Sequence, residues 1–142
     1  MTKKIKLSEI MISLENRSDE YHTYLNLLTY ELGHTISELD KTTSWGKDLK
    51  TFEEIADDEN YLFLPTAYDL HEHQLMVKFS RTTSPEIEEH LLTALFKKGA
   101  FKNFNNLIRR FFLLDKWYAF RDKKIREFAI NWCEQKNINY EE

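Results

Sequence analysis

Apolar residues recur at helical intervals near the start of the chain. Their spacing of three or four residues predicts an amphipathic helix that buries Leu7, Ile10, Met11 and Leu14. Ser8 lies at the start of this stripe, and a serine hydroxyl can accept a hydrogen bond from a first-turn amide. We therefore expect Ser8 to be the N-cap of this helix.

Three short stretches further along have the composition of β-strands. Residues 21–27 and 31–36 are rich in Tyr, Thr, Leu and Ile with partial alternation, which predicts a hairpin. Residues 61–64 form an apolar run that Pro65 ends, and this run predicts a third strand beside the hairpin. The polar and acidic residues 37–60 predict a surface loop, with room for a short helix near 52–56.

Helical patterns dominate the second half of the chain. Asp69 and Glu72 have the spacing of a capping box, which predicts the start of one helix. Ser84, followed by Pro85, predicts the start of the next. That helix is expected to end at Gly99, because glycine favours the left-handed conformation found at helix C-caps.

Two aromatic-rich helices follow. The first is predicted to bury one face, which consists of Phe101, Phe104, Ile108, Phe111 and Phe112. The last helix is expected to begin at a cap formed by Asp115 and to reach about Lys136. Its predicted core stripe includes Trp117, Ile125, Phe128 and Trp132.

Together these elements predict an α+β fold, with a small antiparallel sheet of about three strands packed with four or five α-helices. The 142 residues are 42% hydrophobic and include only three Gly and two Pro, which fits one well-folded, helix-rich domain. We expect residues 1–142 to form that single domain. Its sheet-forming half is expected at about 1–68 and its helical half at about 69–137.

Charge is distributed unevenly along the chain. Residues 1–70 hold seven Lys/Arg against fourteen Asp/Glu, a net charge of −7, whereas residues 71–142 hold thirteen against ten, a net charge of +3. Residues 97–126 alone hold ten basic and two acidic residues, a net charge of +8. This pattern indicates an acidic partner for the basic segment, or two halves that attract each other.

Cysteine content and hydropathy bear on the compartment. The lone Cys133 cannot form an internal disulfide, which is typical of a reducing environment. The N-terminal apolar residues are interrupted by polar ones, so neither a secretory nor a membrane segment is predicted. We expect a cytoplasmic protein that does not act at a membrane.

Several blocks of the sequence resemble an uncharacterised family of bacterial proteins, number 0158 of the UPF series. The resemblance rests on KLSEIMISLENRSDEYHTYLNLLT, YLFLP with DLHEHQLMVKF, KGAFKNF, WYAFRD and AINWCEQKNI, in this order. Such chains tend to carry a Thr-Gly-Glu turn where this one has Thr29, Tyr30 and Glu31, so the glycine of a tight turn is missing here. The resemblance implies no activity and no functional residues.

The basic, aromatic segment 97–126 is the main candidate for a binding surface. Nucleic acids are bound by cations that follow phosphates and by exposed rings that stack on bases, and the segment holds both residue types. Its rings fall at core spacing, however, so an ordinary solvated basic face is the competing interpretation. The candidate binding cations of this segment are Lys102, Arg109, Arg110, Lys123 and Arg126.

Arg121 is a separate candidate. It lies four residues from both Trp117 and Ile125, beside the apolar stripe, where a guanidinium needs a partner. A structural ion pair, with a carboxylate that could come from the acidic N-terminal half, is the favoured interpretation. An anionic ligand is the functional alternative.

Other chemistry finds little support in the sequence. His71 and His73 are only two residues apart, which is not the spacing of helical metal ligands. Asp69 and His73 are four apart and provide at best two ligands, so capping and solvation are the favoured interpretation of this segment. Cys133 has no motif that supplies a base, and there is no glycine-rich phosphate loop. No catalytic residue, metal or cofactor is therefore predicted.

These observations favour a non-catalytic binding or regulatory module that acts through an unidentified protein partner. The alternative is a nucleic-acid-binding protein that uses the basic face of residues 97–126. An enzyme is the least favoured of the three classes, since a site assembled only by tertiary folding leaves no motif.

Overall fold

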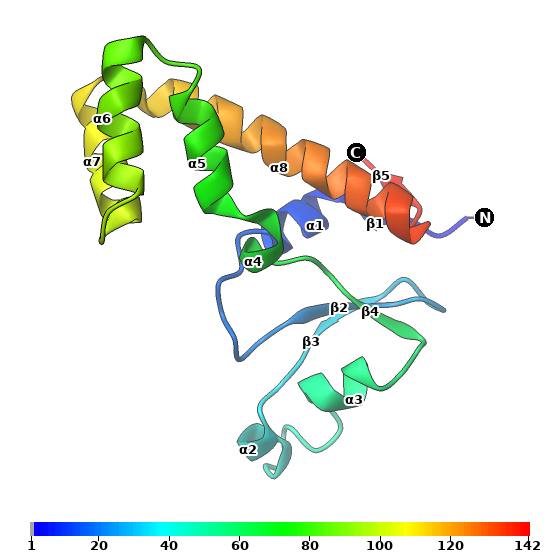
Figure 1. Cartoon of the computed structure of the whole chain (residues 1–142). Coiled ribbons are helices and arrows are strands. Elements are labelled where there is room, and N and C mark those ends of the chain that lie inside the picture. Colours follow the sequence, from blue (N-terminus) through cyan, green and yellow to red (C-terminus); the bar gives the residue numbers. More distant parts are fainter. Residues whose placement is uncertain (1) are drawn as a thin grey trace. The chain divides into compact units, whose positions relative to one another are not determined.

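The computed structural model describes residues 2–142, which fold into two compact units (Figure 1). The sheet unit comprises the chain up to Leu70 together with Ala129–Glu142. The helical unit comprises His71–Phe128. The expectation of a single domain remains a prediction.

The sheet unit contains the three predicted strands. They are β2 (Thr23–Asn26), β3 (Leu32–His34) and β4 (Tyr61–Phe63). β2 lies in the centre and pairs antiparallel with both neighbours, in the order β3-β2-β4. β4 ends at Phe63, shortly before Pro65. Proline cannot donate a ladder hydrogen bond, so it limits the strand.

The turn between β2 and β3 closes without a glycine. Tyr30 has a φ of 62°, in the left-handed region that glycine adopts most easily. The side-chain oxygen of Asn26 accepts hydrogen bonds from the amides of Leu28 and Thr29, and the amide of Tyr30 donates to the carbonyl of Asn26. The Tyr30 hydroxyl also accepts a hydrogen bond from the amide of Asn139 at 3.3 Å. These bonds hold a non-glycine residue in a conformation that costs energy.

The two ends of the chain meet within the sheet unit. β1 (Ile5–Lys6) pairs in parallel with β5 (Tyr140–Glu141). α1 (Leu7–Ser13) starts directly after β1, with Lys6 as its N-cap. The expected cap at Ser8 is therefore wrong, because α1 begins at Leu7 and Ser8 lies inside its first turn.

Two short helices lie in the polar segment 37–60, and the second of them occupies the position where a short helix was considered possible. α2 (Glu38–Lys41) and α3 (Phe52–Ala56) each have a side-chain cap, and the one at α3 is a complete capping box between Thr51 and Glu54. α4 (Ala67–Leu70) follows β4, and the Asp69 carboxylate accepts a hydrogen bond from the amide of Thr66 at 2.8 Å.

The helical unit consists of α5 (Glu72–Ser80), α6 (Pro85–Leu95), α7 (Ala100–Arg110) and the first part of α8 (Leu114–Lys136). His71 adopts a left-handed φ of 56° and separates α4 from α5, so Asp69 and Glu72 do not form the predicted capping box. Ser84 is the N-cap of α6, as predicted, with Pro85 in the first turn.

Aromatic rings fill the core of the helical unit. Phe79 of α5 lies 5.3 Å from Trp117 of α8 between ring centroids, and Phe104 of α7 lies 5.1 Å from the same indole. Both contacts are edge-to-face, the favoured arrangement for buried rings. The three rings join three helices of the unit.

The architecture confirms the predicted α+β class: a three-stranded antiparallel sheet, a small parallel pair and numerous helices. Within the described residues, no helix has the length and apolar character needed to cross a membrane.

Candidate functional site

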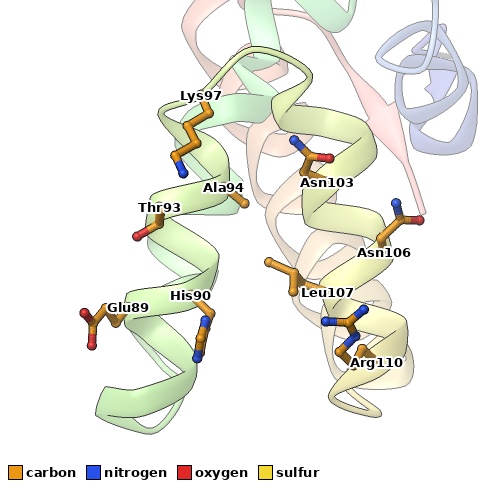
Figure 2. Close-up of a pocket in the computed structure, with 9 residues that line it drawn as sticks. All are labelled: Glu89, His90, Thr93, Ala94, Lys97, Asn103, Asn106, Leu107 and Arg110. Carbon is orange, nitrogen blue, oxygen red and sulfur yellow. The ribbon is translucent and has the colours of Figure 1, made fainter.

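The most distinctive surface of the helical unit is the hairpin formed by α6 and α7. The two helices lie side by side and run in opposite directions (Figure 2). Gly99 makes the tight return possible, since its φ of 77° is a conformation that other residues rarely adopt. It precedes α7 as N-cap, whereas α6 ends at Leu95 with Phe96 as its C-cap.

Only part of the predicted apolar face of α7 is buried. Phe104 and Ile108 are inaccessible to solvent, but Phe101 is 43% exposed and Phe112 is 93% exposed. Phe112 lies beyond the end of α7 with a left-handed φ of 57°, so it does not continue the helical face. The prediction that these two rings belong to the core was wrong.

A groove of about 500 Å³ runs between α6 and α7. Its lining includes His90, Thr93, Ala94, Lys97, Asn103, Asn106, Leu107 and Arg110. Figure 2 shows Lys97 and Asn103 at the loop end and His90 and Arg110 at the open end, with Ala94 and Leu107 between them. The groove therefore has two apolar side chains, Ala94 and Leu107, and the polar Thr93 and Asn106 between a cation near each end.

The polar face of α7 is basic and rich in amides. Lys102, Arg109 and Arg110 are exposed, and α7 contains three asparagines but no acidic residue. Within residues 2–142, no ion pair joins these three cations to a carboxylate. The structure thus brings three of the predicted site residues onto one helix.

The remaining predicted cations lie on α8. Lys123 and Arg126 are exposed there, and the neighbouring Lys124 forms an ion pair with Glu127 at 3.5 Å. Tyr118 on the same helix is half-exposed. This second basic stretch therefore also combines cations with an accessible ring.

Arg121 forms an ion pair inside the helical unit. Its guanidinium donates a short hydrogen bond to the carboxylate of Glu72, the first residue of α5. The side chains are only 14% and 7% exposed, respectively. This is the structural ion pair that the sequence favoured, but its carboxylate comes from the helical unit and not from the acidic N-terminal half.

The residues weighed for metal binding and nucleophilic chemistry have other surroundings. The ring of His73 lies 2.7 Å from the carbonyl oxygen of Leu95, and Asp69 bonds the Thr66 amide. No group of three or more potential metal ligands occurs in the part of the chain that the structure describes. Cys133 is buried, and burial raises the pKa of its thiol to about 11, with a further contribution from the charge of Glu134.

The sheet unit carries an acidic counterpart. A groove of about 670 Å³ is lined by the carboxylates of Asp19, Glu20, Glu38, Asp40 and Glu53. Tyr21 and Phe52 contribute half-exposed rings to the same lining. Apolar and anionic side chains thus occur together on this surface.

Several groove residues escaped the sequence analysis. The sequence around His90, Thr93 and Ala94 on α6 matches no binding motif, and neither does the sequence around Leu107 on α7. Helical spacing was the signal that could have found them. One face of α6 carries positions 90, 93 and 94, and one face of α7 carries positions 103, 106, 107 and 110. Recognising them also requires knowing that the two helices are antiparallel.

The fold and the site define an α+β protein with a basic helical hairpin on its surface. The chain belongs to the uncharacterised protein family UPF0158, whose family model matches residues 3–141. Searches of curated proteins and of solved structures found no match.

Proposed function

We propose that this protein is a non-catalytic binding or regulatory module that acts through a protein partner. The observation that carries the proposal is the set of phenylalanines that the hairpin leaves in solvent. Phe96 is 71% exposed after α6, and Phe112 is 93% exposed after α7. Each lies close in sequence to a groove cation, Lys97 or Arg110.

The combination of exposed rings and arginines is typical of protein interfaces. Aromatic residues and Arg are enriched there and supply most hot spots. Phe96 makes one edge contact, with the ring of His73 at 5.6 Å between centroids, and leaves most of its surface in water. Such a ring contributes little to the stability of the isolated chain, but it releases water when a partner covers it. The proposal includes the predicted cytoplasmic location, with which the buried free thiol of Cys133 agrees.

Affinity purification of the tagged full-length protein from its native cells tests the proposal. We expect the wild-type protein to retain a specific protein that a Phe96→Ser, Phe112→Ser variant does not retain. Both positions are exposed, so the variant is expected to keep its fold, which circular dichroism checks. A partner retained equally by the two proteins would contradict the role of these rings, and no specific partner would contradict the proposal.

Nucleic-acid binding is the second candidate, because exposed rings accompany the basic residues. Phe101 lies in the first turn of α7 and Phe112 lies beyond its end, and the α7 cations Lys102, Arg109 and Arg110 are exposed. Lys123 and Arg126 would extend this surface onto α8. Fluorescence anisotropy with single-stranded RNA and duplex DNA, at low and near-physiological salt, tests it. Binding that falls with salt and disappears in a folded Arg109→Glu, Arg110→Glu variant would favour this candidate.

A further inference from the structure

The groove between α6 and α7 has the form of a seat for a third helix. Phe104 and Ile108 direct one side of α7 into the core, so the groove lies on a different side of the helix. Its middle includes Ala94 on α6 and Leu107 on α7, a small and a large apolar side chain. An amphipathic helix can lay its apolar face into such a groove.

The ends of the groove set the charge of the occupant. Lys97 lies at the loop end and Arg110 at the open end (Figure 2). The carboxylate of Glu89, which also belongs to the lining, points away from α7. Residues 71–128 hold twelve Lys/Arg against seven Asp/Glu, a net charge of +5, so the surroundings also favour an anion.

The length of the groove sets the spacing of the occupant's charges. Asn103 near one end and Arg110 at the other are seven residues apart on α7, which corresponds to about 10.5 Å along a helix. Two carboxylates on a docked helix span the same distance when they are also seven residues apart. An apolar side chain three or four residues after the first would then face Ala94 and Leu107.

We propose that the α6–α7 groove binds an acidic amphipathic helix of a partner protein, with carboxylates seven residues apart at Lys97 and Arg110 and an apolar residue between them over Ala94 and Leu107. This inference rests on the proposed function and specifies the site and the partner's chemistry.

Selection from a displayed library of 18-residue helical peptides, randomised on one face, tests the proposal. The full-length protein serves as target, with counter-selection against a Lys97→Glu, Arg110→Glu variant. A Lys78→Glu, Lys116→Glu variant is the matched control, because it makes the same charge change at two exposed lysines of the helical unit that lie outside the groove lining. Circular dichroism and urea unfolding establish that both variants are folded.

We expect enriched peptides to carry two acidic residues seven apart with Leu, Ile or Val between them. Their affinity should fall at least about tenfold for the groove variant and change less than about threefold for the control. Enrichment of non-acidic peptides, equal losses in the two variants, or no enrichment would overturn the groove inference. If the groove inference fails but a native partner still binds the groove variant, the proposed function stands. Salt-sensitive oligonucleotide binding without any protein partner would contradict both the groove inference and the proposed function.

Discussion

The ion pair between Glu72 and Arg121 allows a quantitative test of the helical unit. Replacing Glu72 by Gln leaves a guanidinium that is only 14% exposed without its carboxylate. Breaking a fully buried pair costs about 3–5 kcal/mol, and partial solvent access at Arg121 reduces our expectation to about 2–3 kcal/mol. Replacing both partners, by Glu72→Leu and Arg121→Met, removes both desolvated charges, so the double variant should lie within about 1 kcal/mol of wild type.

Urea unfolding followed by circular dichroism measures these differences, provided that the slope of free energy against urea is unchanged. Glu86→Gln is the matched control, because Glu86 is an exposed acid in the first turn of α6. It should lose only the interaction with the helix dipole, about 0.3–1 kcal/mol. The reasoning is refuted if Glu72→Gln costs no more than Glu86→Gln, or if the double variant is destabilised by the sum of its single changes.

Four further predictions concern the sheet unit. Tyr30→Phe should lower the free energy of unfolding by about 0.5–1 kcal/mol in urea, because it removes the hydrogen bond from the Asn139 amide; an unchanged value would show that this 3.3 Å bond contributes nothing. Thr51→Ala should cost about 1 kcal/mol through loss of the α3 cap. In wild type, the hydrogen bond from Lys41 lowers the pKa of Glu54 below its usual 4.5. The stabilisation from ionised Glu54 is therefore present above pH 4.5 and is lost as the pH falls through the folded-state pKa. The free energies of unfolding of wild type and Glu54→Gln, measured across pH 3–6, should converge in acid. The raised pKa of Cys133, about 11, predicts slow alkylation by iodoacetamide at pH 8 in the folded protein and fast alkylation in urea; equal rates would contradict its burial.

Local patterns were sufficient where an element announces itself within a few residues. Alternation predicted β2 and β3, and Ser84 with Pro85 marked the start of α6. The pairing of β1 with β5 could not be predicted, because each strand has only two residues and their partners are about 135 positions apart in the chain. The Glu72–Arg121 pair depends likewise on which helices pack together, although the position of Arg121 beside an apolar stripe showed that it needed a partner.

The error at α7 has a different cause. Periodicity shows which residues share a helix face, but not how wide the covered strip is. α7 has eleven residues and buries only Phe104 and Ile108, one turn apart, so Phe101 at the margin and Phe112 beyond the helix end remain accessible. The same limit concealed the groove, because its lining follows from the packing of α6 on α7 and not from either helix alone.

The structural boundaries also sharpen the charge pattern. The C-terminal residues 129–142 hold one basic and three acidic residues and belong to the sheet unit, whereas the predicted helical half reached about residue 137. The net charge of the helical unit is therefore +5, and that of the sheet unit is −9, with eight Lys/Arg against seventeen Asp/Glu. Arg121 is also neutralised within its unit by Glu72, so the accessible positive charge is concentrated on the α7 face and the exposed cations of α8. At physiological salt, exposed charges are screened over about 8 Å. The acidic partner that we propose should therefore associate faster as the ionic strength falls. Its contacts with Ala94 and Leu107 should instead slow dissociation.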